Sequence, residues 1–458
     1  MRNPMKLLPL SLALLLAPTF ASADDLLQVY DQARQNDPTL KIAKDTNLSI
    51  GENVDIATAA LLPQISASYG FTDSHGSSTS QQPVQDENGN LVLVPYTSSS
   101  SSRGVNWGGR LDQSILDFSR WTARKAAKEQ ALRSDSQYVQ AEQDLAIRVA
   151  TAYFNVLTNE DSVTFSQAEE KALERQLDQA QQRFEVGLSA ITDVNEAKAQ
   201  YDSARAATIN AQNILDDARE ALREITGQEP GALLRLREKL PLNEPVPNDM
   251  QVWVDRAISE NPGLKAQELA LAAANTNIRT QRAGHLPTLG GSITYNNTPS
   301  WGDRTVQGRL NPINNTGSET AIGLSLNVPI FTGGATQARV RQAVYDRDAA
   351  QDTFEQQKRA LIRNTRLNFR AVVAGISEVE ARKQAVVSAN SALEATQAGF
   401  EVGTRTIVDV LLSQRQLYQA QRDHSQARHN FVVNQLKLRQ SAGNIEQKDL
   451  AEVNALLE

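Results

Sequence analysis

Side chains that could catalyse a reaction or bind a metal are few in this chain of 458 residues. It contains no cysteine, which excludes a thiolate nucleophile and a sulfur metal site. His424 and His429 are five residues apart, whereas two imidazoles on one helix face need the spacing i, i+4. The Gly333-Gly334 pair lacks the further glycine of a dinucleotide-binding loop. We therefore expect no catalytic residue, no metal site, no cofactor and no enzymatic activity.

The most informative pattern is instead a long internal repeat. The segment Arg183–Gly227 aligns without gaps to Gly399–Gly443, 216 positions later, and the sequence Phe-Glu-Val-Gly recurs at 184–187 and 400–403. An earlier block, which begins at Asp31, recurs 224 positions later at Asp255. A duplication of this length predicts two structurally equivalent halves, so function should lie in features that both halves share.

Each half contains a long segment that favours helix. From Arg120 to Glu185 there is neither proline nor glycine, and good helix formers predominate. Apolar residues recur at spacings of three and four, as a seam between helices requires, at Leu145, Val149, Ala152 and Val156. At 1.5 Å per residue this helix would be roughly 100 Å long. The second half has a matching segment over 336–402.

Both long helices should end at a glycine. Gly187 and Gly403 each follow a valine, and glycine readily adopts the left-handed conformation that closes a last turn. Helix then resumes, and Thr406 and Asp409 have the spacing of a capping box. The sequence therefore predicts two helical hairpins, over 120–227 and 336–443, and an additional helix in each half, over 24–60 and 249–283.

Alternating apolar and polar residues predict two strand hairpins, over 62–115 and 286–331. Their central stretches, His75–Ser102 and Asn296–Ser318, are polar and rich in turn-forming residues, so they are expected to be exposed loops. The strands are long enough to cross a bilayer at a tilt, and aromatic residues lie on their apolar faces. A hairpin packed on a soluble core is the alternative interpretation.

Hydropathy does not decide between these alternatives. No run of 18 apolar residues follows residue 23, and the mean hydropathy is −0.42, but membrane strands contribute little to such averages. Four membrane strands cannot close, because their edges would leave unpaired backbone groups in hydrocarbon. Two copies would supply eight strands and a filled barrel, whereas three copies would supply twelve and an open lumen.

The N-terminal segment, residues 1–23, has the composition of a secretory signal. Arg2 and Lys6 precede the apolar stretch Leu7–Ala17, and a small-x-small cleavage site ends at Ala23. The net charge of −7 would become −9 after removal of these two basic residues. An acidic, exported chain without a basic tract is not expected to bind nucleic acid.

These features resemble the TolC-type outer-membrane factor family, and the absence of a cysteine for lipid attachment resembles its TolC branch. The repeated Val-Gly tips carry most of the resemblance, together with Val386–Ala389, Gln28–Tyr30 and Asn36–Pro38. The resemblance implies a mixed fold of membrane β-barrel and long α-helical coiled-coil hairpins. A homotrimer would form a twelve-strand barrel, continued by a helical tunnel in the periplasm. The repeats would span 24–247 and 248–443, and an equatorial belt would include 228–247 and 444–458.

The resemblance also implies a function. Members of the family are passive exit ducts in the Gram-negative outer membrane for efflux and type I secretion. Their partners are outer-membrane lipid, a periplasmic adaptor and an inner-membrane pump of the RND, ABC or MFS type. The alternative is a soluble periplasmic coiled-coil adaptor or spacer, which would need a lipoyl-like β domain and no membrane strands.

Two sets of site residues follow from the resemblance. The periplasmic gate would include Asp178, Arg405 and Asp409, and the sequence departs from the family pattern at Phe400 and Leu412, where a tyrosine and a second acid are expected. The adaptor-docking tips would be Val186, Gly187, Leu188, Val402, Gly403 and Thr404. Each has a simpler interpretation: Asp409 as a helix cap, Arg405 as a solvated loop charge, and the two glycines as helix ends only.

Overall fold

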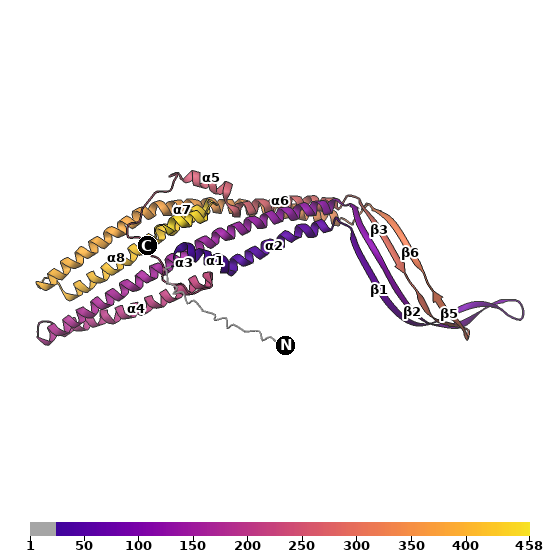
Figure 1. Ribbon diagram of the computed structural model, residues 1–458, viewed down its shortest axis with the longest axis horizontal. Coiled ribbons are helices and arrows are strands. Elements are labelled where there is room, and N and C mark those ends of the chain that lie inside the picture. The colour runs from indigo at the N-terminus through magenta and orange to yellow at the C-terminus, as the bar shows by residue number, and fades with distance from the viewer. Residues whose placement is uncertain (1–23) are drawn as a thin grey trace, which may run out of the picture. The chain divides into compact units, whose positions relative to one another are not determined.

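A computed structural model describes residues 24–458 (Figure 1), so the expected signal segment lies outside the described residues. The chain divides into two compact units. The first, the hairpin unit, contains residues 24–44, 138–262 and 358–458, and the second, the sheet unit, contains 45–137 and 263–357. Each unit takes segments from both sequence halves, so the spatial division differs from the division into repeats.

Two antiparallel helical hairpins dominate the hairpin unit (Figure 1). They are formed by α3 (Phe118–Glu185) with α4 (Ile191–Thr226), and by α7 (Ala335–Glu401) with α8 (Ile407–Ser441). Three of the four residues of the predicted seam, Leu145, Val149 and Val156, are buried, and Ala152 is partly buried. The predicted interhelical seam is therefore confirmed.

The helix expected at the start of each half is divided in two. In the first half α1 (Leu26–Asn36) is followed by α2 (Pro38–Ala59), and in the second α5 (Met250–Glu260) is followed by α6 (Pro262–Ala283). The prediction of one continuous helix was wrong, because proline lacks the backbone N–H and disfavours helical geometry in the residue before it.

Asp37 stabilises the first of these breaks. Its buried carboxylate accepts hydrogen bonds from the backbone N–H of Leu40 at 2.8 Å and from Arg148 Nη2 at 2.7 Å. Burial by itself would raise the pKa of this carboxyl group, but the hydrogen bonds from Arg148 and Leu40 keep it below its ordinary value.

Short segments surround the main core of the hairpin unit. Tyr153 is fully buried and donates its hydroxyl hydrogen to the carbonyl oxygen of Leu234 at 2.8 Å. Single β-bridges join Leu233 to Asp24 and Leu236 to Leu457. The linker after α4, the chain end and α9 (Gln447–Asn454) thus pack together.

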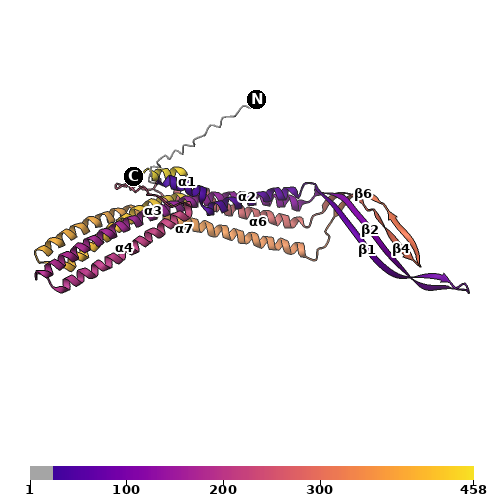
Figure 2. The ribbon, with the colours of Figure 1, turned by 60° about the horizontal axis from the view of Figure 1, so that its bottom comes forward.

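The sheet unit contains one antiparallel sheet (Figure 2). Its strands are β1 (Gln64–Gln85), β2 (Leu91–Leu116), β3 (Thr288–Asn297), β4 (Ser300–Val306), β5 (Arg309–Asn315) and β6 (Ser318–Asn327). Strand β2 pairs with β1 along one edge and with β3 and then β4 along the other. Strands β6 and β5 form the outer row beside β3 and β4.

These six strands behave as four long ones, two of which are interrupted. Trp107 pairs with Asn297 and Gly104 with Ser300, so the register is the same on both sides of the gap between β3 and β4. Across this gap Thr298 donates its backbone N–H to the carbonyl oxygen of Gly317 at 2.8 Å. The sequence predicted four strands, and the sheet has four long strands, two of which are interrupted.

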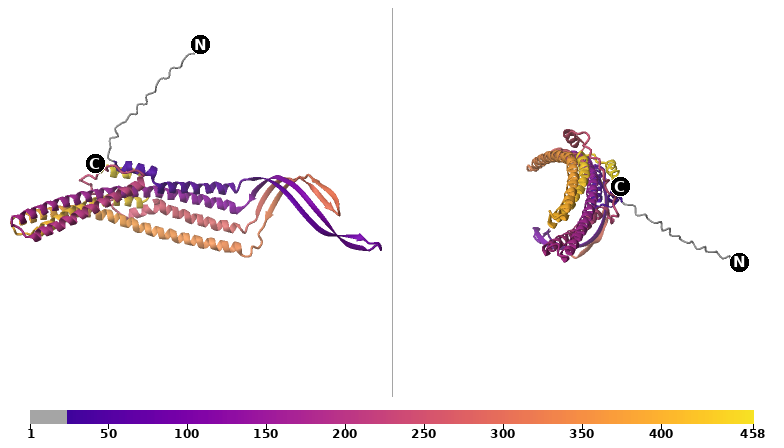
Figure 3. Two further views of the ribbon diagram at one scale, coloured as in Figure 1. Left: turned by 90° about the horizontal axis from the view of Figure 1, so that it is seen from below. Right: turned by 90° about the vertical axis from the view of Figure 1, so that its left-hand side faces the viewer.

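The two predicted loops are mostly strand. Within His75–Ser102, only the turn between β1 and β2 is unpaired, and the β1–β2 hairpin extends past the other strands (Figure 3). Serine hydroxyls pair across it, with 2.8 Å between Ser74 Oγ and Ser102 Oγ. Within Asn296–Ser318, most residues belong to β4 and β5. The loop prediction failed because a polar composition does not prevent cross-strand pairing.

One face of the sheet is apolar and exposed. The register places Ile65, Leu111, Ile293 and Ile322 in one row across the four long strands. Ile65 and Ile322 are 80% and 78% exposed. Over residues 24–458, none of the helices carries an apolar stretch that could span a bilayer. Within the same residues, no group of three or more acidic or histidine side chains could hold a metal ion.

Candidate functional site

The tips of the two hairpins have the same backbone geometry. Gly187 and Gly403 have φ values of 76° and 81°. Gly187 donates its N–H to the carbonyl oxygen of Phe184 at 2.9 Å, and Gly403 donates to that of Phe400 at 3.1 Å. A side chain at either glycine would meet nothing within 4 Å. Glycine is therefore required here by the left-handed backbone and not by crowding.

An exposed valine precedes each glycine, and an exposed leucine follows Gly187, whereas the exposed Thr404 follows Gly403. Val186 and Leu188 are each 69% exposed, and Val402 is 76% exposed. Exposed apolar residues at the end of an otherwise polar helical hairpin are typical of a surface that binds another protein. Each chain thus presents two tips with exposed apolar side chains.

The helix start after the second tip is capped. Thr406 Oγ1 accepts a hydrogen bond from the backbone N–H of Asp409 at 3.3 Å, and the Asp409 carboxylate accepts one from the Thr406 N–H at 2.9 Å. The predicted capping box is therefore confirmed. Hydrogen bonds from the Thr406 backbone and side chain lower the pKa of Asp409, and the nearby charge of Arg405 acts in the same direction.

A cavity of about 250 Å³ lies between the two hairpin tips. Both hairpins line it, and its walls include Arg183 and Asp193 from the first and Phe400 and Arg405 from the second. Asp178 is exposed elsewhere on α3 and does not line this cavity. Across residues 24–458 of a single chain, no hydrogen bond or ion pair joins Asp178 to Arg405.

Asp193 lines this cavity but is not among the gate residues predicted from the sequence. It occupies the first turn of α4, as Asp409 occupies the first turn of α8. The signal was present in the repeat, because the two residues are 216 positions apart, which is the constant offset of this region. Asp178 and Arg183 are both on α3, but 100° of rotation per residue places them on different faces.

The two positions that depart from the family pattern differ in environment. Phe400 is half-buried, and the Arg183 guanidinium lies 5.0 Å from the centre of its ring. Leu412 is 54% exposed on α8. Leu412 follows Val410 and Leu411, so no acidic side chain occupies this position, whereas Phe400 contacts the Arg183 guanidinium.

Polar contacts also connect α3 to α8 farther from the tips. Arg422 Nη1 lies 3.0 Å from Glu169 Oε2, and Ser425 donates a hydrogen bond to Asp161. Nδ1 of the buried His429 lies 2.8 Å from Thr158 Oγ1. From the sequence, His429 could be considered only as a metal ligand, because its partner Thr158 is 271 residues away in the chain.

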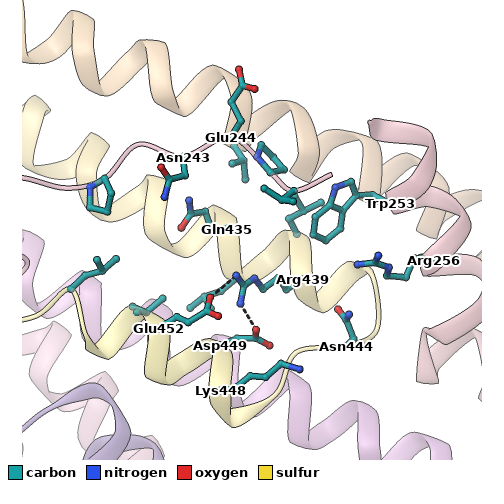
Figure 4. A pocket seen from close by; sticks show the side chains of 18 residues that line it. Asn243, Glu244, Trp253, Arg256, Gln435, Arg439, Asn444, Lys448, Asp449 and Glu452 are labelled. Carbon is teal, nitrogen blue, oxygen red and sulfur yellow. Dashed lines mark hydrogen bonds and ion pairs between the residues drawn. The ribbon is translucent and has the colours of Figure 1, made fainter. Parts of the chain in front are cut away.

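A larger cavity, of about 510 Å³, lies near the C-terminal segment (Figure 4). Its main polar feature is Arg439, which bonds Asp449 and lies 2.7 Å from Glu452 Oε2. Trp253 donates its indole N–H to the carbonyl oxygen of Pro247 at 2.9 Å. These charges are paired with one another, so the cavity is explained by the packing of α8 against α9.

Comparison with known proteins identifies the class to which this fold and these tips belong. The family described as outer membrane efflux protein matches residues 29–228 and 253–444. The chain belongs to this family.

Individual relatives match over nearly the full length. Outer membrane protein TolC of Vibrio cholerae is 37% identical over 454 residues, which cover 98% of each chain. The alkaline protease secretion protein AprF of Pseudomonas aeruginosa is 28% identical over 96% of this chain and 89% of its own. Among solved structures, the outer membrane protein VceC of Vibrio cholerae has a TM-score of 0.70 at 17% identity, covering 92% of this chain and 96% of its own. This last similarity concerns the fold alone.

Proposed function

We propose that this chain forms a homotrimeric exit duct in the outer membrane of a Gram-negative bacterium and serves efflux and type I secretion. Family membership and the similarity to TolC support the location and the efflux role. The similarity to AprF, named for the secretion of a protease, supports a role in secretion. The duct is passive, as the family resemblance implies.

The observation that carries the proposal is an open sheet with an apolar face. Within residues 24–458, β1 pairs only with β2, and β6 pairs only with β3. Both outer strands therefore present unpaired backbone groups, and each such group costs several kcal/mol in hydrocarbon. Pairing β1 of one copy with β6 of the next removes these edges. Three copies supply twelve strands and an open lumen, and the apolar row faces lipid.

The remaining parts of the chain have roles in this assembly. The hairpins of the repeats 24–247 and 248–443 would form a periplasmic tunnel, with 228–247 and 444–458 in a belt around it. The tips would dock a periplasmic adaptor, and an inner-membrane pump of the RND, ABC or MFS class would supply the energy. The exposed apolar side chains at both tips support this docking.

The test is the mass and location of the assembly. We expect the exported protein in the outer-membrane fraction and, in mild detergent, at the mass of three mature chains. A monomer or dimer in detergent would contradict the trimer. Recovery in the soluble periplasmic fraction would favour the alternative of an adaptor or spacer.

We propose that Arg405 and Asp409 belong to a gate at the periplasmic end. Asp178 and Arg405 are unpaired with each other within one chain, and Asp178 is exposed, which supports a link between neighbouring copies. Three Asp409 carboxylates would form a ring, and Leu412 leaves it as the single acidic ring at this mouth. A fixed ring of negative charge attracts cations into a narrow pore.

We expect Asp409→Ala to reduce the cation selectivity of the channel and its block by multivalent cations, and Leu412→Asp to increase both. Planar-bilayer conductance measures these quantities. Asp202→Ala is the control, because Asp202 is an exposed acid on α4 that does not line the cavity between the tips. Unchanged selectivity in Asp409→Ala would leave Asp409 with its capping role alone.

A further inference from the structure

Arg183 and Phe400 make a direct contact between the two hairpins of one chain. Arg183 lies near the end of α3 and Phe400 near the end of α7. The guanidinium carbon is 5.0 Å from the ring centroid, within the distance at which an aromatic face attracts a cation. Phenylalanine has no hydroxyl group, so the interaction depends on the ring itself.

The environment of Arg183 supports a specific role for this contact. Its Nε atom is buried and has no hydrogen-bond partner in the described part of the chain. A buried donor without an acceptor is costly, and a freely solvated surface arginine would not keep that position. The side chain is therefore held by its packing against the second hairpin.

Phe400 belongs to two apolar groups. One joins the hairpins to each other and contains Leu173, Ala204, Ile407 and Leu411. The other lies within the second hairpin and contains Leu393, Val410 and Leu417. When the second hairpin moves away from the first, Phe400 keeps the contacts of the second group. It loses the contact with Arg183, and the apolar group that joins the hairpins is divided.

We propose that the Arg183–Phe400 contact is a latch that holds the two hairpins of each chain together and sets the resting opening of the periplasmic end. This inference rests on the proposed channel function. Arg183 is then a positioning residue of the gate, distinct from the acidic and basic residues that the family resemblance indicates. The two side chains also line the cavity between the tips, so docking there could separate them.

A latch of this kind should depend on salt differently from an ionic link. At 1 M salt the Debye length is about 3 Å, so exposed ion pairs are largely screened. The Arg183 guanidinium is partly buried and in direct contact with the Phe400 ring, so most of the attraction between them should persist at 1 M salt. Channels that lose the latch should therefore differ from wild type at both low and high salt.

The test compares the resting conductance of purified trimers in planar bilayers at 0.1 M and 1 M KCl. Breaking the contact by Arg183→Gln or Phe400→Leu should raise the ratio of open to closed channels by roughly 3- to 30-fold per contact. Phe400→Tyr keeps the ring and should stay near wild type. The double variant Arg183→Gln with Phe400→Leu should open no further than the more open single variant.

Arg175→Gln is the matched control, since Arg175 is exposed on the same helix and does not line the cavity between the tips. Equal conductance of Arg183→Gln and wild type would overturn the latch, as would equal opening in Phe400→Leu and Phe400→Tyr. Each variant must first show the mass of the wild-type trimer. If wild-type protein forms neither trimer nor channel, the proposed function fails and the latch fails with it. If wild-type channels form, the variants test the latch alone.

Discussion

Gly403→Pro and Gly187→Pro are each expected to abolish export while the protein still reaches the outer membrane as a trimer. Both glycines have φ values near 80°, and proline is restricted to about −65°. Proline also removes the N–H that Gly403 donates to the carbonyl oxygen of Phe400. The turn must rearrange, which displaces the exposed Val402 and should disrupt the proposed docking surface. Neither glycine belongs to the sheet through which the copies are proposed to pair.

The susceptibility of cells to pump substrates measures this effect. We expect a strain that carries either variant to be as sensitive as one that lacks the protein. Gly308→Pro is a matched control, because Gly308 has a φ value of 77° and equally open surroundings, but lies in the β4–β5 turn. Normal efflux through an intact Gly403→Pro trimer would exclude this tip from the docking function.

Acidification from pH 6.5 to 4 is expected to lower the free energy of unfolding through His429. Burial lowers the pKa of His429 to about 4, from an ordinary value of 6.5. The charge of Asp161 opposes this shift, while Arg428 and Arg235 add to it. Between these two pH values the unfolded chain binds a proton that the folded chain does not. Stability is therefore retained above pH 6.5 and falls, by roughly 3 kcal/mol per chain, as the pH approaches 4.

The urea midpoint of the solubilised protein at several pH values tests this expectation. His429→Gln should be less stable at neutral pH and lose less stability between pH 6.5 and 4. The exposed His285 supplies the control, and His285→Gln should keep the wild-type pH dependence. The same pH dependence in wild type and His429→Gln would show that other groups are responsible.

The helical hairpins could be predicted from the sequence because their signals are local. A long stretch without proline or glycine, a glycine at each end and a capping box at Thr406 each act within a few residues. The break before Pro38 was equally local, and the sequence contained the signal for it. The loop error at His75–Ser102 differs, because pairing depends on the partner strand and not on composition alone.

The residues around the tip cavity could be predicted only in part. Arg405 was assigned through the family resemblance, and Gly403 was identified from the internal repeat and the helix-end pattern. Arg183 and Asp193 were not, because their importance depends on which face of α3 and which end of α4 meet the second hairpin. The family resemblance favoured Asp178, whereas the geometry of a single chain places Asp193 in the cavity with Arg405.

The sequence by itself determined the duplication, the long helices with their glycine ends, and the alternation that makes one face of each strand apolar. These properties follow from backbone preferences and side-chain periods of a few residues. The tertiary structure alone decided that Arg183 lies on the ring of Phe400, that His429 is buried beside Thr158, and that β3 and β4 continue one register. Such contacts join segments far apart in the chain, and their energies depend on burial and orientation, which exist only once the helices and strands have packed.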